Sequence, residues 1–198
     1  MLNTAKCLAN CLKWLLAAIL CSSFAFASDR QDITAQSSSL EFSVQILGVL
    51  KKRGHFGEFN GHLKRQSGAA NTAAVYLTIR SDSAVMRSKK DTEMVKGEDF
   101  FASAKFPEVR FESAAFDAGL LLDTQALHAI SGHLSLRGKR LPETLTLKVL
   151  SCDKLDALEK CSFQVTGELG RARYGMQSHR AFVGDDVRLT LVIKGLLP

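Results

Sequence analysis

The stretch LEFSVQILGVLKKRGHFGEFNGHL, residues 40–63, decides the fold of this chain. In its first part, apolar and polar residues alternate strictly with a period of two. Such alternation is typical of a β-strand with one buried face. The residues of the apolar side are Leu40, Phe42, Val44 and Ile46.

The second part of the stretch, residues 53–63, predicts one further strand with a bend in it. Phe56 and Phe59 have opposite parity, so a regular strand cannot turn both rings to the same side. Gly57 lies between them and indicates a bulge or a sharp bend. Strands need bends of this kind to coil into a barrel.

The same alternation recurs along the rest of the chain, which brings the number of predicted strands to eight. The further strands are expected near residues 73–79, 109–112, 130–136, 145–149, 163–169 and 187–193. Residues 89–96 instead carry polar helix formers followed by Gly97, which predicts one short helix. We therefore predict an all-β protein, an extended antiparallel eight-stranded lipocalin-like β-barrel with a short helical insertion. A two-sheet sandwich is the alternative.

The first 27 residues have the form of a cleavable signal peptide. Lys6 and Lys13 flank the start of an apolar run, which ends in the small-x-small sequence of residues 25–27. An uncleaved membrane anchor is the alternative, but the run is short for a membrane span. We expect the mature protein to begin at Ser28, residues 28–198 to form one barrel domain, and the location to be periplasmic.

Charge and cysteine usage agree with export and give no reason to expect a nucleic acid partner. The formal net charge of +6 falls to +4 when the two lysines of the leader are removed. Basic residues are scattered apart from a short cluster at 51–53, which is typical of a solvated turn. Only Cys152 and Cys161 of the five cysteines follow the leader. An isolated pair in an oxidising compartment predicts a disulfide, since zinc would need further ligands nearby.

The sequence contains no recognisable catalytic arrangement. G-x-S-x-G, H-E-x-x-H and the phosphate-binding G-x-x-x-x-G-K are missing, and the five histidines and the acidic residues are dispersed. We therefore predict a protein that is not an enzyme and binds no metal. The positive signal is apolar, because ten of the twelve phenylalanines follow the leader. A small barrel is either filled by side chains or open to one ligand, and composition leaves both possibilities open.

Four blocks of sequence, in order, resemble those of a known family. They are FSVQILGVLKKRGHFGEFNGHL at 42–63, DFFASAKFPEVRFES at 99–113, GHLSLRGKRLPETLTLKV at 132–149 and RARYGMQSHRAFVGDDVRLTLVIKG at 171–195. With them the mature chain resembles the YceI-like family of lipocalin-like periplasmic polyisoprenoid-binding proteins over nearly its whole length. It departs from the family pattern at Gln36-Ser37, where a histidine-serine pair is usual, and at Tyr174, where phenylalanine is usual.

The resemblance implies a periplasmic binding or carrier protein that holds a long isoprenoid lipid, a polyprenyl phosphate or a quinone, in a hydrophobic tunnel. No cofactor is required. The alternative is an accessory protein that presents a bound quinone to a membrane redox enzyme or acts in stress response. The expected partner is the isoprenoid lipid or another long-chain amphiphile, with transient membrane contact and a homodimer left open.

The candidate tunnel residues lie on the apolar side of a predicted strand or in the aromatic segment after the helix. They are Phe42, Val44, Phe56, Phe59, Phe100, Phe101, Phe111 and Phe163. Arg53 is the candidate for a phosphate head group, with a solvated turn residue as the alternative interpretation.

Overall fold

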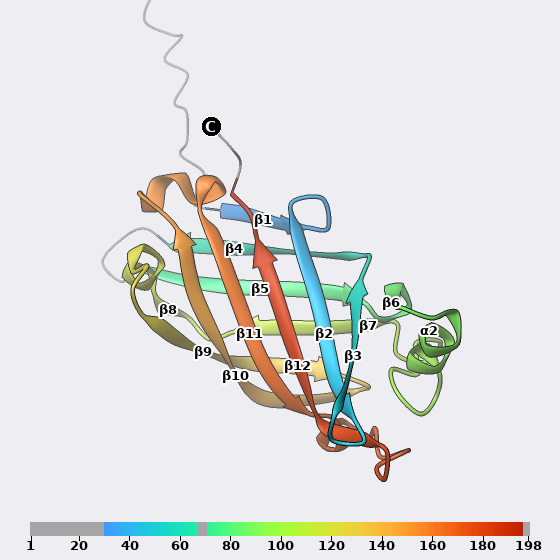
Figure 1. Ribbon diagram of the computed structural model, residues 1–198. Coiled ribbons are helices and arrows are strands. Elements are labelled where there is room, and N and C mark those ends of the chain that lie inside the picture. The colour runs from blue at the N-terminus through green and yellow to red at the C-terminus, as the bar shows by residue number, and fades with distance from the viewer. Residues whose placement is uncertain (1–29, 67–70, 196–198) are drawn as a thin grey trace, which may run out of the picture.

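The structure is a computed structural model that describes residues 30–66 and 71–195. The predicted signal peptide, residues 1–27, and Ser28 lie outside the described residues. No helix in the described ranges is long and apolar enough to cross a bilayer. The described chain is one curled antiparallel sheet with short helices at its ends (Figure 1). Its strands are β1 (Arg30–Thr34), β2 (Ser38–Ile46), β3 (Leu50–Phe56), β4 (Phe59–Gln66), β5 (Thr72–Arg80), β6 (Ala84–Met86), β7 (Glu108–Ser113), β8 (Phe116–Asp117), β9 (Leu127–Leu136), β10 (Lys139–Ser151), β11 (Ser162–Gly170) and β12 (Val183–Ile193).

The sheet curls into a barrel, and the chain crosses four times between its two edge regions. The strand order is β1-β4-β5-β7-β9-β10-β11-β12-β2-β3-β6, with β8 beside β5. One crossing leads from β3 to β4 at Gly57, and another leads from β5 to β6 through the 3-10 turn η1 (Ser81–Ser83). These two crossings are bonded to each other, since the Gly57 N–H donates to the Ser83 carbonyl at 3.1 Å. The expected all-β barrel is therefore confirmed.

The prediction of eight strands is wrong in number, because the sheet has 12. Residues 53–63 do not form one bent strand: β3 ends at Phe56, and β4 begins at Phe59 near the opposite edge. Both rings are buried because they reach the interior from different strands. The other additional strands are β1, β6 and β8, which are too short or too polar to show apolar alternation.

The predicted helix is confirmed as α2 (Lys89–Lys96). The Ser88 side chain accepts a hydrogen bond from the Asp91 N–H, which satisfies one of the free donors of the first turn. The N–H of Gly97 then closes the last turn on the carbonyl of Glu93. No residue of α2 is buried. It lies beside β6 at one side of the barrel (Figure 1).

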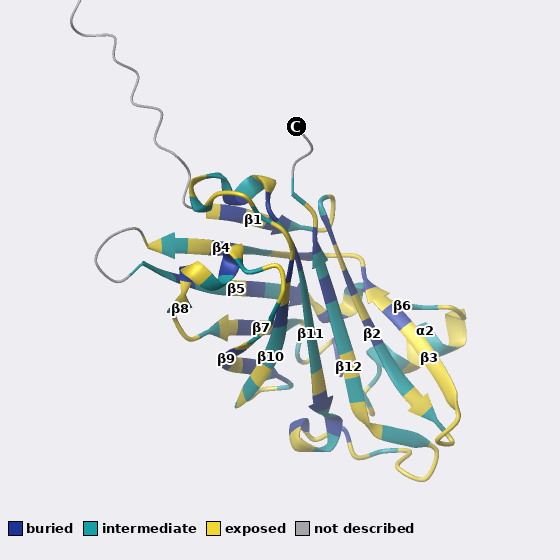
Figure 2. Ribbon diagram, turned by 60° about the vertical axis from the view of Figure 1, so that its left-hand side comes forward, coloured by how far each residue is buried: buried dark blue, intermediate teal, exposed yellow. Residues whose placement is uncertain are grey.

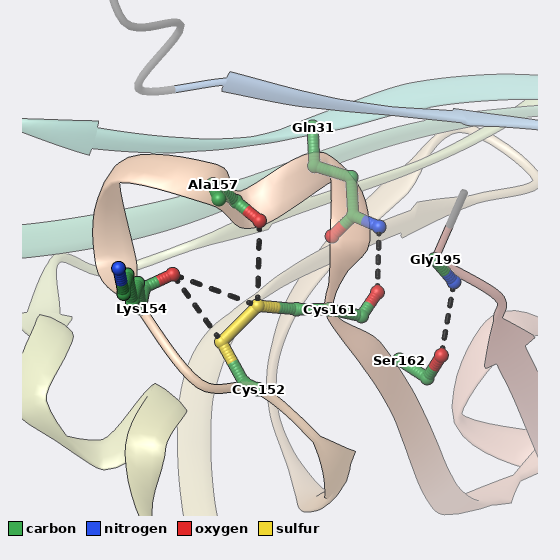
Figure 3. Close-up of a disulfide and its surroundings, with 7 residues drawn as sticks. All are labelled: Gln31, Cys152, Lys154, Ala157, Cys161, Ser162 and Gly195. Carbon is green, nitrogen blue, oxygen red and sulfur yellow. Dashed lines mark hydrogen bonds between the residues drawn. A yellow bond between two sulfur atoms is a disulfide. The ribbon is translucent and has the colours of Figure 1, made fainter. Parts of the chain in front are cut away.

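The predicted disulfide Cys152–Cys161 is present and joins the ends of β10 and β11. It closes the loop that contains the 3-10 segment η3 (Leu155–Lys160). The Gln31 side chain of β1 donates from Nε2 to the Cys161 carbonyl at 2.9 Å (Figure 3). Disulfide and hydrogen bond together fasten β1 and η3 over one end of the barrel.

We expect the double substitution Cys152→Ser, Cys161→Ser to lower the free energy of unfolding by about 2–3 kcal/mol, because a short loop is no longer closed in the unfolded chain. Urea unfolding of the variant and of the wild type, with and without reductant, measures this. Reduced wild type should match the variant. A wild-type midpoint that reductant does not move would contradict the expectation.

Candidate functional site

The inside of the barrel contains two adjacent cavities lined almost entirely by apolar side chains. The outer cavity, at the end that carries α2 and the β2–β3 turn, has a volume of ≈ 340 Å³. The inner cavity, toward the disulfide end, has a volume of ≈ 60 Å³. Four residues belong to the walls of both, which makes the cavities neighbours along one axis: Ile79, Leu134, Leu169 and Leu189.

Strand alternation is the reason why the walls are apolar. On β2, Leu40 lines the inner cavity, while Phe42, Val44 and Ile46 line the outer one. The residues between them in sequence point to the outside of the sheet. The barrel is therefore hollow in its outer half and largely filled in its inner half, so the expected tunnel is not open along its whole length.

Seven of the eight candidate tunnel residues line one of these cavities. Phe111 and Phe163 belong to the inner wall, and the outer wall contains Phe42, Val44, Phe56, Phe100 and Phe101. Phe59 is the exception: it is buried in the core but belongs to neither wall. The structure gives the positions of these side chains in the cavity walls. That they contact a ligand remains a prediction.

Three phenylalanines from distant parts of the sequence form a cluster in the wall of the outer cavity. The ring centroids of Phe42 and Phe56 lie 5.1 Å apart, and Phe101 lies 5.9 Å from Phe42 and 5.5 Å from Phe56. These separations are in the range of favourable aromatic pairs. Gly54 makes the cluster possible, since a Cβ there would lie 2.5 Å from the Phe42 ring.

Two polar pairs lie at the mouth of the outer cavity. Lys52 of β3 forms an ion pair with Asp91 of α2, with Nζ 2.5 Å from Oδ2. Asp99 accepts a hydrogen bond from Ser178 Oγ at 2.5 Å and lies 3.2 Å from His179 Nε2. The bond from Ser178, with that of His179, holds the pKa of Asp99 below its usual range. Both pairs connect segments that are distant in sequence.

Arg171 is the most unusual side chain of the outer wall, because its guanidinium is fully buried. It donates to four backbone carbonyls, those of Gly184, Met176, Ser178 and Val183, at 2.7–2.9 Å. Burial lowers the pKa of Arg171. Its hydrogen-bond partners are neutral carbonyls rather than a carboxylate, so a positive charge stands in the cavity wall.

Arg53, the predicted head-group residue, does not line the outer cavity. Gly54 and Phe56 of the same strand point inward, and the alternation turns Arg53 to the outer surface. It lines a separate surface groove together with Glu41 and His55. The basic side chain that β3 contributes to the cavity is its neighbour Lys52, and the parity of Phe56 in the sequence already indicated this.

A buried carboxylate in the wall of the inner cavity is hydrogen-bonded to a residue in the wall of the outer cavity. The sequence analysis did not identify this carboxylate. Glu143 belongs to the inner wall, and its Oε1 accepts hydrogen bonds from Tyr174 and Arg173, both at 2.7 Å. Burial, together with the bond to Glu143, raises the pKa of Tyr174. The Tyr174 hydroxyl supplies a hydrogen-bond donor for this carboxylate.

The described residues offer no group of three or more His, Cys, Asp or Glu side chains that could hold a metal ion. The cluster of Ser178, His179 and Asp99 contains a hydroxyl, an imidazole and a carboxylate, but it is not arranged for nucleophilic attack. Ser178 donates to Asp99 rather than to His179, so the imidazole does not activate the hydroxyl. What the site can do is enclose an apolar molecule.

These features define the class of small antiparallel barrels with an apolar internal cavity that opens at one end. Residues 32–195 match the YceI-like domain, and the chain belongs to this family. It is similar to the UPF0312 protein SAB2563 of Staphylococcus aureus, with 24% identity over 79% of this chain and 88% of the relative.

Two solved structures have the same fold. The crystal structure of Burkholderia cenocepacia BcnA superimposes with a TM-score of 0.66 at 18% identity, over 80% of this chain and 96% of that one. A polyisoprenoid binding domain from Saccharophagus degradans, implicated in plant cell wall breakdown, gives a TM-score of 0.59 at 15% identity. That comparison covers 84% of this chain and 97% of the domain.

Proposed function

We propose that this protein is a periplasmic carrier for a long apolar isoprenoid lipid, a polyprenyl phosphate or a quinone, and that it catalyses no reaction. The observation that carries the proposal is the apolar outer cavity of ≈ 340 Å³. This volume falls within the range of about 300–1,000 Å³ that is usual for small-molecule sites. The Saccharophagus domain with this fold is described as polyisoprenoid-binding, which supports the ligand class.

The shape of the interior suits a chain-like ligand. The cavity residues of β2 run from Leu40 to Ile46, which is ~20 Å of extended strand. Each methylene buried there contributes about 0.8 kcal/mol, reduced by the cost of ordering ligand and protein. A chain longer than the outer cavity needs inner side chains such as Leu145 to move, since the inner cavity is only ≈ 60 Å³.

The polar head of the lipid belongs at the mouth, where the charged side chains of the wall are found. Arg171 offers a buried positive charge, and Lys52 offers an ammonium group that is half exposed. Both attract a phosphate, and either can donate a hydrogen bond to a quinone carbonyl. The deeper wall has no comparable cation among the described residues that line it.

Neighbouring residues of β3 give a matched test of this head-group position. Lys52→Met should weaken binding of a polyprenyl phosphate two- to five-fold, about 0.5–1 kcal/mol for a partly exposed charge, and should change quinone binding less. Arg53→Met should leave both unchanged, because Arg53 lies outside the outer cavity. Delipidated protein titrated with each lipid and assayed by native mass spectrometry measures both. An equal loss in the two variants would contradict the assignment.

The periplasmic location rests on the leader sequence of residues 1–27. We infer that the leader is removed after Ala27, which leaves the barrel with its disulfide in an oxidising compartment. Intact-mass measurement of the protein from the periplasmic fraction should give a chain that begins at Ser28. A chain that retains residues 1–27 in the membrane fraction would reject this location.

A further inference from the structure

The end of the barrel at the cavity mouth exposes large apolar side chains to solvent. The β2–β3 turn contributes Leu47, Val49 and Leu50, which are 59%, 84% and 60% exposed, and Phe182 is 60% exposed. These are four of the five most exposed large apolar residues in the described chain. The Leu47 N–H donates to the Phe182 carbonyl at 2.8 Å, so the two segments are joined. We call these four residues the apolar tip.

The backbone of the β2–β3 turn makes a leucine at its apex a costly choice. Leu47 and Gly48 have φ of 51° and 71°, the left-handed conformation at two successive positions of the three-residue loop between Ile46 and Leu50. Asn, Asp or Gly usually occupies the first of these positions, since a larger side chain is strained there. A solvent-exposed turn gains nothing from leucine in this place.

The β9–β10 turn of the same protein provides an internal comparison. Arg137 and Gly138 adopt φ of 51° and 73°, almost the same two values, in a loop of two residues. There the strained position carries a polar side chain, which donates to the carbonyls of Glu98 and Phe100. In the β2–β3 turn the same position instead presents an apolar side chain outward.

Basic residues lie next to the apolar tip in both segments. Lys51, Lys52 and Arg53 come after Leu50 in the exposed first part of β3 (Figure 2), and the exposed Arg180 comes two residues before Phe182. Lys51 to Arg53 lie within ~10 Å of Leu50 along the strand. Carboxylates are also present at this end: Asp91 is paired with Lys52, and Asp185 accepts a hydrogen bond from the Ala172 N–H.

The apolar tip continues the wall of the outer cavity. Phe182 is itself a wall residue, and so are Ile46 and Val183, which are paired in register just behind the turn. The described ends of the chain and the disulfide lie at the opposite end of the barrel (Figure 1). A ligand that leaves or enters the outer cavity therefore passes the apolar tip.

We propose that the apolar tip docks into the surface of an anionic lipid bilayer, with the mouth of the outer cavity facing the lipids. Side chains of this kind bury in the boundary between head groups and acyl chains, about 5–10 Å deep. Lys51, Arg53 and Arg180 then lie at the level of the lipid phosphates, where basic residues are attracted. The inference rests on the proposed lipid-carrier function and adds the surface through which the lipid is exchanged.

Co-sedimentation with vesicles tests the docking. Wild-type protein should sediment with vesicles of phosphatidylglycerol and phosphatidylethanolamine and much less with phosphatidylcholine alone. The double substitution Val49→Asp, Leu50→Asp should lower the bound fraction roughly tenfold or more, because it adds two negative charges in place of two apolar side chains. Neither residue lines the outer cavity, so lipid content after solvent extraction should be unchanged.

A matched control introduces two aspartates in place of two exposed apolar side chains at the other end of the barrel. Leu127 and Leu150 are also exposed, and Leu127→Asp, Leu150→Asp should leave vesicle binding unchanged. Equal losses in both double variants, or no vesicle binding by a lipid-loaded wild type, would overturn the docking and leave the carrier function intact. A wild type that dimerises through the apolar tip, with the tip variant monomeric in sedimentation velocity, would also overturn it. Protein that binds vesicles but never contains lipid would instead refute the carrier function.

Discussion

Phe101→Asp is expected to remove the bound lipid while the barrel stays folded. Phe101 contacts both Phe42 and Phe56 in the wall of the outer cavity, so a carboxylate there is placed next to the isoprenoid chain of the proposed ligand. An unpaired charge in an apolar site is costly, and the phenylalanine loses about 1.5–3 kcal/mol of burial. Together these effects should reduce affinity for an isoprenoid roughly 10- to 100-fold or more.

The fold should survive because Phe101 is half-buried and does not belong to a strand. Its backbone N–H donates to the Val95 carbonyl at 3.0 Å whatever the side chain is. A loss of about 1–3 kcal/mol is typical of such a substitution, against about 5–15 kcal/mol for a whole domain.

Lipid extraction and mass spectrometry of the purified variant give the result. Phe101→Leu, which keeps an apolar side chain, should retain most of the lipid, and Leu127→Asp adds the same charge on an exposed site at the other end of the barrel. If Phe101→Asp retained the lipid content of the wild type, the outer cavity would not be the binding site.

Arg171→Met is expected to have the largest effect on stability. The guanidinium donates to four backbone carbonyls at once, and methionine removes the donor from one buried and three part-buried hydrogen bonds. A single unsatisfied buried acceptor costs about 1–3 kcal/mol, so the four, which are not additive, should cost roughly 3–5 kcal/mol. The chain between Gly175 and Gly184 would lose its anchor and with it one side of the outer cavity.

Urea unfolding of Arg171→Met and of Arg188→Met distinguishes the loss of a buried guanidinium from the loss of a positive charge alone. Arg188 forms an exposed ion pair with Glu168, whose loss should cost less than about 1 kcal/mol. Arg171→Lys should resemble Arg171→Met, since an ammonium group cannot reach four carbonyls in the fixed fork of a guanidinium. A cost below about 1 kcal/mol for Arg171→Met would show that the carbonyls find other partners.

The features that depend on neighbouring residues in sequence could be predicted. Period-two alternation identified which side of β2 faces the interior, and polar helix formers followed by Gly97 identified α2. The cysteine pair could be assigned because only two cysteines follow the leader. In each case the deciding interaction lies within a few residues, or few alternatives exist.

The features that depend on long-range pairing could not be predicted. Phe56 and Phe59 read as one strand, although β3 and β4 lie near opposite edges of the sheet, because strand order is not encoded in alternation. The contact between Glu143 and Tyr174 forms only after two different parts of the chain fold together. The volume of the inner cavity depends on side-chain packing, so a sequence that suits a tunnel is equally compatible with a nearly filled interior.

The position of Arg53 outside the outer cavity has a simpler cause. The basic residues at 51–53 were considered as one group, but in a strand only every second side chain faces the cavity. Counting back from Phe56 selects Gly54 and Lys52, which are the wall-side residues of β3. Strand parity in the sequence is therefore sufficient to select Lys52 as the basic residue of β3 on the cavity side.

Native mass spectrometry of the protein isolated from its own cell envelope tests most directly whether the barrel carries a lipid. The proposed function predicts a complex of one chain with one long-chain isoprenoid, which is released by organic solvent and identified by its mass as a polyprenyl phosphate or a quinone. The Phe101→Asp protein isolated in the same way should give the free chain alone. A wild-type protein that is ligand-free from the envelope, and that remains ligand-free after incubation with both lipids, would contradict the proposed function.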